Sequence, residues 1–277
     1  MKTHHIITAL SVGWLAFTLS ACNFTNEEKE QMIKSNNGKD FFRDSEKWGK
    51  VTTRSLSLGE FTHIVMDGNA DIHLRQGEEF LVEVTGNEKA IDANSIQVEN
   101  GKKDGETVLH VAAKERNLNS LPSIKIDVMV PDIRGIQVNG EGDFDIKGEA
   151  FFDGDLTIVI NGDGDVEATT VGCDALSITI NGDGDMTAKK FKCTRAEIQM
   201  NGNGDITTDV KADNITLQLS GDGEADLDVK CENLNISAGG NGEVKLKGKC
   251  KNLTKQTFGK ASLDSRRLQV SGDIKIK

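Results

Sequence analysis

A pentapeptide, Asn-Gly-x-Gly-Asp/Glu, returns about every twenty residues through the second half of the chain. Copies or weaker versions of it begin at Asn139, Asn161, Asn181, Asn201, Ser220 and Gly239. Successive copies start 22, 20, 20, 19 and 19 residues apart. Because self-similarity at a fixed short period is typical of proteins that stack one unit on the next, this feature predicts a solenoid.

Apolar and polar residues alternate on both sides of each pentapeptide. In the copy at Asn181, Ile178 and Ile180 precede the motif and Met186 follows it. Period-two alternation indicates a strand with one buried face, so each unit is a strand, a sharp corner, a second strand and a return. One such unit cannot bury its own apolar face, and stacked units share a core. The predicted fold class is therefore all-β: a single parallel β-helix (β-solenoid) with rungs of 19–22 residues.

The corner residues have a structural explanation. Glycine accepts positive φ and a close approach of another backbone, which a tight corner requires. Asparagine side chains in one column can hydrogen-bond to the same side chain one rung away, as in amide-laddered β structures. The requirements of the fold thus explain most of the motif, and the motif says much less about function.

The chain divides into four parts by these patterns. Residues 1–21 are a signal peptide, 22–50 a polar tether, 51–138 irregular rungs and 139–277 the regular repeats, so the solenoid domain is 51–277. Within the irregular part, Asp67-Gly68-Asn69-Ala70-Asp71 is a weaker corner, and the 72 residues before Asn139 allow about three longer rungs. At roughly twenty residues per rung the whole domain would hold about eleven rungs.

The N-terminus predicts export and a lipid anchor. Lys2 precedes an apolar run from Ile6 to Leu19, and small residues lead to Cys22. This order is typical of a secretory signal peptide. A cysteine directly after Ser-Ala resembles the lipobox of bacterial lipoproteins, whose cysteine carries acyl chains after the signal is removed. We therefore predict lipidation of Cys22 and attachment to the outer membrane, on the cell surface or the periplasmic face. The alternative is an ordinary signal peptide with a chance cysteine.

The net charge and the aromatic content limit the classes of partner that the chain is expected to bind. The net charge of −11 does not suit nucleic acid or an anionic membrane surface, since both require a basic face. The chain has no tyrosine and two tryptophans, which disfavours an aromatic platform for stacking sugars. The predicted partner is an unknown surface or envelope macromolecule, either protein or glycan.

Acidic residues fall into two columns when the repeats are aligned. The candidate metal ligands are Asp143, Asp165, Asp185, Asp205 and Glu224 in one column and Asp163, Asp183 and Asp222 in the other. Carboxylates ~4.8 Å apart repel by about 0.9 kcal/mol per pair in bulk water, which an exposed corner tolerates. Oxygen ligands at a glycine turn also suit calcium. A solvated acidic ridge is favoured, a calcium stack is the alternative, and no other cofactor is predicted.

Four cysteines share one further column, eight residues before the asparagine position. They are Cys173, Cys193, Cys231 and Cys250. Stacking would place Cys173 beside Cys193 and Cys231 beside Cys250, at a spacing inside the range for a disulfide. Cysteine is also among the most buried residue types. Buried free thiols are favoured, and two disulfides in an exported protein are the alternative.

Catalysis finds little support in the sequence. His63, His73 and His110 are scattered in the irregular half, and the motifs of serine hydrolases, zinc proteases and nucleotide-binding loops are absent. No catalytic residue is predicted. A polysaccharide-degrading enzyme is the alternative, because other parallel β-helices host such enzymes. Lys114, Glu115 and Arg116 are its candidate residues.

A lipobox, the pattern F-x-x-I-x-x-x-G at Phe61, Ile64 and Gly68, and repeated N-G-x-G-D units together resemble the putative auto-transporter adhesin, head GIN domain family. The resemblance covers residues 55 to about 270. It implies an exported, right-handed β-helical protein of Bacteroides-like bacteria with no established activity, and no functional residues come with it. We therefore expect a non-enzymatic, adhesin-like envelope lipoprotein that binds a macromolecule. A purely structural envelope spacer is a further alternative.

Overall fold

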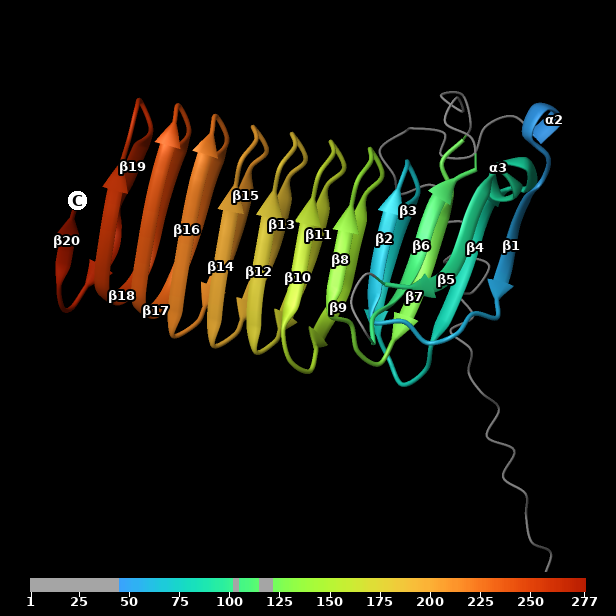
Figure 1. Ribbon diagram of the computed structural model, residues 1–277, viewed down its shortest axis with the longest axis horizontal. Coiled ribbons are helices and arrows are strands. Elements are labelled where there is room, and N and C mark those ends of the chain that lie inside the picture. Colours follow the sequence, from blue (N-terminus) through green and yellow to red (C-terminus); the bar gives the residue numbers. More distant parts are fainter. Residues whose placement is uncertain (1–44, 102–104, 115–121) are drawn as a thin grey trace, which may run out of the picture. The chain divides into compact units, whose positions relative to one another are not determined.

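The computed structural model describes residues 45–101, 105–114 and 122–277 (Figure 1). The signal peptide and Cys22 lie outside these residues. The described helices are α2 (Ser45–Trp48) and α3 (Glu88–Asp92), and neither is long and apolar enough to cross a membrane. The strands are β1 (Val51–Leu56), β2 (His63–Asp67), β3 (Asp71–Gln76), β4 (Leu81–Asn87), β5 (Asn94–Asn100), β6 (Thr107–Ala113), β7 (Lys125–Val130), β8 (Gly135–Val138), β9 (Phe144–Phe151), β10 (Leu156–Ile160), β11 (Val166–Gly172), β12 (Ala175–Ile180), β13 (Met186–Lys192), β14 (Arg195–Met200), β15 (Ile206–Lys211), β16 (Asn214–Gly221), β17 (Glu224–Gly240), β18 (Glu243–Thr257), β19 (Ser262–Val270) and β20 (Ile274–Ile276).

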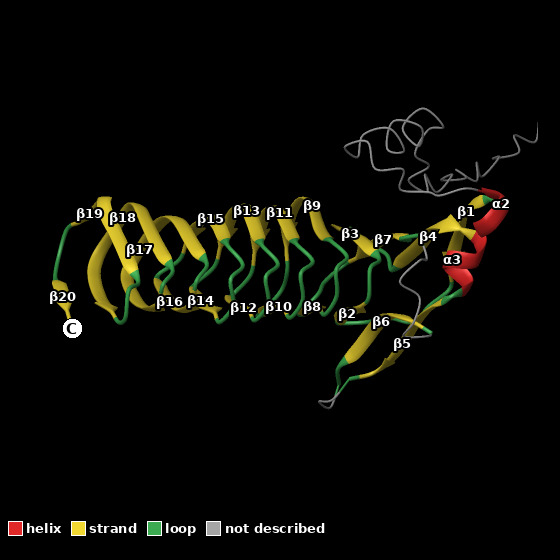
Figure 2. Cartoon of the chain, turned by 90° about the horizontal axis from the view of Figure 1, so that it is seen from above, coloured by secondary structure: helices red, strands yellow, loops and turns green. Residues whose placement is uncertain are grey.

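Each regular turn gives one strand to each of two parallel stacks (Figure 2). The first stack is β2, β8, β10, β12, β14, β16, the second halves of β17 and β18, and β20. The second stack is β3, β9, β11, β13, β15, the first halves of β17 and β18, and β19. Pairing is in register, so that Ile158 lies beside Ile178 and Ile178 beside Ile198. The parallel β-solenoid prediction is confirmed.

The core lies between the two stacks and follows the alternation in the sequence. Ile178, Ile180 and Met186 are completely buried, whereas Thr187 between two inward residues is exposed. The solenoid has about seven turns of about twenty residues. The expectation of about eleven rungs is wrong, because part of residues 51–138 forms antiparallel strands instead of rungs.

The corners stack backbone on backbone. A Cβ added at Gly182 would lie 2.1 Å from the carbonyl oxygen of Gly162 in the turn below, and Gly202 has the same relation to Gly182 at 2.0 Å. The asparagines form the predicted ladder: Asn181 Nδ2 donates to Asn161 Oδ1 at 2.8 Å and Asn201 Nδ2 to Asn181 Oδ1 at 2.9 Å. Glycine is needed here because no side chain fits between successive corners.

A second asparagine ladder, which the sequence analysis does not predict, lies on the return side. Asn233 Nδ2 donates to Asn214 Oδ1 and Asn252 Nδ2 to Asn233 Oδ1, each at 2.9 Å. These residues recur at 19-residue intervals, which is the signal that identifies them. The second ladder therefore begins at Asn214, just after the first ladder ends at Asn201.

The N-terminal part does not stack in sequence order. The β2–β3 turn lies between β6–β7 on one side and β8–β9 on the other. The corner at Gly68 is directly below the corner at Gly140, as the weaker motif predicts. The expectation of about three rungs between Asp67 and Asn139 is not met: among the described residues of this segment, only β6–β7 forms a further turn, and β1, β4 and β5 pair antiparallel.

Helix α3 and residues 47–49 close this end. Asn87 Nδ2 donates to the Gly49 carbonyl oxygen at 2.9 Å, and Lys89 Nζ donates to that of Lys47 at 2.7 Å. Residues 47–49, which the sequence analysis assigns to the tether, are thus hydrogen-bonded to the folded domain.

Candidate functional site

The first acidic column has a structural role. Each carboxylate accepts a hydrogen bond from the backbone N–H of the equivalent residue in the next turn. The chain of acceptors runs Asp71, Asp143, Asp165, Asp185 and Asp205, and the last donor is Glu224. The donor–acceptor distances range from 2.7 to 3.3 Å. All of these acceptors except the partly buried Asp71 lie at an exposed ridge, and they also satisfy corner N–H groups that the strands leave unpaired.

The second acidic column pairs acids with the asparagines interspersed in it. Asp183 accepts from Asn203 Nδ2 and Asp222 accepts from Asn241 Nδ2, each at 2.8 Å. Asp163 lies in the same column one turn before Asp183. Within the described ranges, no group of three or more His, Cys, Asp or Glu side chains is placed to hold a metal ion. The calcium stack remains a prediction.

The cysteine column brings both expected pairs together. Cys231 pairs in register with Cys250, and the thiols of Cys173 and Cys193 are hydrogen-bonded to each other. All four are free thiols, of which Cys250 is buried and the others partly buried. Burial and the neighbouring Cys250 raise the pKa of the Cys231 thiol to about 12, so it is a weak nucleophile. The two disulfides remain a prediction for the exported protein.

A shallow groove of about 530 Å³ crosses the outer face of the second stack. It lies where the strand register shifts, between Ala168 and Thr170 in β11 and between Ala188 and Phe191 in β13. The groove is lined by Ala168, Thr169, Thr187, Ala188, Lys189, Thr207, Thr208, Asp209, Asp226 and Lys247. Small residues at the register shift leave the space, and hydroxyl and charged groups border it.

Asp226 and Lys247 form an ion pair in the lining of the groove. The Asp226 Oδ1 is buried and accepts no hydrogen bond, and Lys247 Nζ lies 3.6 Å away, beyond hydrogen-bond distance. A buried acceptor that accepts no hydrogen bond costs free energy, and the charge of Lys247 offsets part of this cost. This groove is the candidate binding site.

A column of lysines runs beside the groove on the same face. Lys192, Lys211, Lys230 and Lys249 are paired in register on β13, β15, β17 and β18, and all are exposed. These lysines are not among the predicted site residues. Their spacing of 19 residues is the signal that could have done so.

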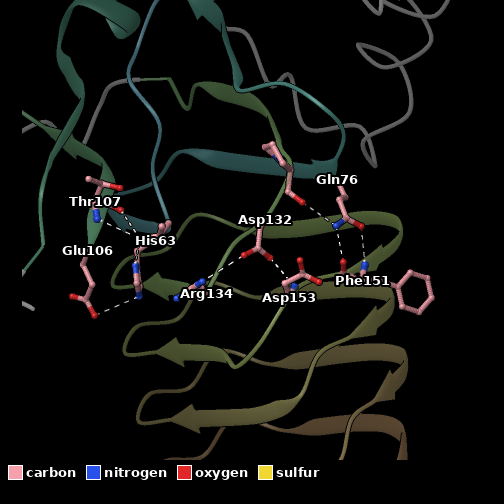
Figure 3. Close-up of polar contacts among 10 residues, drawn as sticks. His63, Gln76, Glu106, Thr107, Asp132, Arg134, Phe151 and Asp153 are labelled. Carbon is pink, nitrogen blue, oxygen red and sulfur yellow. Dashed lines mark hydrogen bonds and ion pairs between the residues drawn. The ribbon is translucent and has the colours of Figure 1, made fainter. Parts of the chain in front are cut away.

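The three histidines contact carboxylates near the N-terminal turns. His73 Nε2 lies 3.0 Å from Asp145 Oδ2, and its Nδ1 lies 3.6 Å from Asp127 Oδ1. His110 lies between Asp67 and Glu99. Figure 3 shows His63 directed at Glu106, with 3.7 Å between Nε2 and Oε1. The histidines that the sequence shows as scattered thus contact carboxylates and link strands distant in the sequence.

The contacts of His73 predict a pH-dependent stability. Burial lowers the pKa of His73, but Asp127 and Asp145 more than offset this effect and the pKa lies above its ordinary value. Burial raises the pKa of Asp71 to about 6. Both pKa values are raised in the folded protein, so both groups stabilise it at low pH and this stabilisation is lost as the pH rises. The contribution of Asp71 to the free energy of unfolding is fully present below pH 3.8 and is lost as the pH rises through about 6. The contribution of His73 is present below pH 6.5 and is lost above it. We expect these groups to lower the free energy of unfolding between pH 4 and 8 by on the order of 1–2 kcal/mol.

Urea unfolding at several pH values, with Asp71→Asn combined with His73→Gln, measures this contribution. The double variant should show a flatter pH profile than the wild type, whereas Asp174→Asn, at an exposed position, should not. A double variant with the wild-type profile would contradict the assignment.

Comparisons with known proteins agree with this architecture. The family model described as "Putative auto-transporter adhesin, head GIN domain" matches residues 60–209 and 194–277. A putative adhesin from Bacteroides fragilis is 19% identical, with a TM-score of 0.56 over 82% of this chain and 97% of that chain. A putative adhesin from Parabacteroides merdae is 18% identical, with a TM-score of 0.56 over 83% and 97%. A putative lipid binding protein from Parabacteroides distasonis gives the same identity, TM-score and coverage as the latter. The search of curated proteins found no match.

Proposed function

Because the chain belongs to the putative auto-transporter adhesin, head GIN domain family, we propose that it is an adhesin-like scaffold that binds a macromolecule without catalysis. The family description implies a place outside the cytoplasm. The ligand, a surface or envelope glycan or protein, lies along the outer face of the second stack.

The groove is the observation that carries the proposal. It crosses several turns, so an extended ligand can make the same contact repeatedly, as concave surfaces of other solenoids allow. Thr187 and Thr207 offer hydroxyl groups from equivalent positions, and Asp209 adds a carboxylate to the lining. Such a surface supplies many weak polar contacts from a rigid sheet.

The chemistry of the groove favours binding over catalysis. Its ionisable lining consists of Lys189, Asp209, Asp226 and Lys247, and it holds no histidine or cysteine. The pair from the enzyme alternative, Glu115 and Arg116, lies outside the described residues. Lys114 Nζ donates to the Asp92 carbonyl oxygen near α3, far along the chain from the groove.

We also propose that Cys22 carries the lipid that holds the protein at the outer membrane. The sequence order of signal peptide, lipobox and polar segment supports this anchor. A lipidated cysteine with more than one acyl chain holds a protein stably at a bilayer. The solenoid would then extend from the membrane as a binding surface.

Binding of the protein, purified from the envelope of cells that make it, to an array of immobilised polysaccharides, mucin and matrix proteins tests the function. We expect at least one array component to be bound by the wild type and lost with Thr187→Glu combined with Thr207→Glu. Both positions are exposed, so the charges enter the groove without entering the core.

The matched control carries the same two charges on the first stack, as Thr157→Glu combined with Gln218→Glu, also at exposed positions. It should bind like the wild type. Absence of binding to every component, equal loss in both variants, or release of new reducing ends from a bound polysaccharide would overturn the proposal.

A further inference from the structure

The lysine column is an unusual arrangement of like charge. Lys192, Lys211, Lys230 and Lys249 stand on adjacent parallel strands about 4.8 Å apart, so the column spans about 14 Å. The residues that precede three of them, Phe191, Val210 and Val229, are buried, so the alternation directs the lysines outward. Like charges directly opposite each other on neighbouring strands are unfavourable.

Other lysines of the same turns are neutralised within the chain. Lys245 Nζ lies 2.7 Å from Glu224 Oε1 and 3.2 Å from Glu243 Oε2, and Lys247 contacts Asp226. Among the described residues no carboxylate forms an ion pair with a lysine of the column. Asp209 and Asp228, two residues earlier on the same strands, lie on the same face without pairing with them.

An exposed aromatic ring lies at one end of the column. Phe151 is 49% exposed, and its ring covers Gly172, where an added Cβ would lie 2.4 Å from Phe151 Cδ1. Lys192 Nζ is 5.3 Å from the ring centroid. Figure 3 shows how Gln76 fixes this residue: its Nε2 donates to the Phe151 carbonyl oxygen at 2.6 Å, and its Oε1 accepts the Phe151 N–H at 2.8 Å.

The other end of the column opens into a second shallow groove of about 340 Å³. It is lined by Asp228, Val229, Lys230, Gly248, Lys249, Arg267 and Gln269. Residues 243–277 as a whole hold ten Lys and Arg residues and three Asp and Glu residues. Positive charge is thus concentrated on the last turns of a chain whose net charge is −11.

We propose that this column binds a linear anionic glycan, a polysaccharide with carboxylate or sulfate groups at regular intervals. The inference rests on the proposed function and names its ligand class. A ligand that runs along the solenoid axis can place successive anions over successive lysines, and Phe151 can pack against a sugar ring. Asp209 and Asp228 can accept hydrogen bonds from sugar hydroxyls, which every sugar unit supplies and a phosphodiester backbone does not. The surface therefore suits an acidic glycan better than a nucleic acid.

The probe is immobilised polygalacturonate, with its fully methyl-esterified form as the uncharged counterpart. We expect the protein to bind the acid form, with an affinity that falls as salt is added. Lys211→Gln with Lys230→Gln should weaken binding by about tenfold or more. The control, Lys251→Gln with Lys260→Gln, removes equal charge from exposed positions outside the column and should stay within about twofold. Lys211→Arg with Lys230→Arg should retain binding.

Equal weakening in the control, equal binding of the esterified form, or tighter binding of single-stranded DNA would overturn the inference. If the acid glycan is not bound while another array component is still lost with the Thr187 and Thr207 variants, the inference fails and the proposed function stands. If the lysine pair controls glycan binding but the threonine variants do not, the column is the binding site and the groove is not.

Discussion

Gly182→Ala is expected to destabilise the solenoid by about 3 kcal/mol, near the upper end for overpacking, because the new methyl group meets backbone. The added Cβ would lie 2.1 Å from the Gly162 carbonyl oxygen and 2.9 Å from its carbon. That oxygen accepts the N–H of Gly184 at 3.1 Å, so moving it away breaks a bond that joins the two turns. Flexible side chains could adjust, but here the obstructing atoms belong to the next corner.

Thermal and urea unfolding of wild type and variant, followed by circular dichroism, measures this effect. The matched control is Gly59→Ala, where an added Cβ has no atom within 4 Å and the backbone φ is not in the left-handed region. Its effect should stay within about 0.5 kcal/mol. Similar stabilities for the two variants would show that the corners can separate, contrary to the stacked geometry.

The regular turns could be predicted from the sequence because local and long-range signals coincide there. The same period places apolar residues in the core, glycines at the corner and asparagines in a ladder, as at Ile178, Gly182 and Asn181. Once one turn is assigned, its neighbours in space are its neighbours in sequence. The fold class follows from that repetition alone.

The order of the N-terminal turns could not be predicted in this way. Ile64 pairs with both Leu109 and Ile136, so its turn is inserted between two segments that follow it in the chain. Alternation identifies β2 and β3 as strands, but it contains no information about which strands they join. Gly135 indicates a close contact, since an added Cβ there would lie 2.1 Å from His63 Cδ2. In the sequence, however, a single glycine does not show which residue it contacts.

The candidate site was predicted only in part, because only some of its residues belong to the repeated motif. The acidic columns are visible because they belong to the motif, and the structure gives them backbone N–H groups to accept. The groove depends on register shifts near Ala168 and Ala188, which alternation alone does not locate. Lys211 and Lys230 lie outside the pentapeptide, so an alignment of the pentapeptide copies does not include them.

The inserted turn leads to the second large expected effect, from Ile64→Ala. Ile64 is completely buried, and removal of its side chain should cost about 3 kcal/mol in lost burial and a residual cavity. Since β2 lies between β6 and β8, the damage should reach strands that are distant along the chain: the partners of Ile64, Leu109 and Ile136, are 45 and 72 residues away from it. Amide hydrogen exchange should show lost protection in β6 and β8, with β16 to β18 retained.

Ile198→Ala provides the matched control, because Ile198 is equally buried and loses the same atoms. Its partners, Ile178 and Leu217, lie in the turns before and after it in sequence. Lost protection should therefore centre on β12 and β16 and leave β6 unaffected. If Ile64→Ala instead lowers protection only in β2, β3 and the strands that immediately follow them, the N-terminal turns stack in sequence order and the inserted arrangement is wrong.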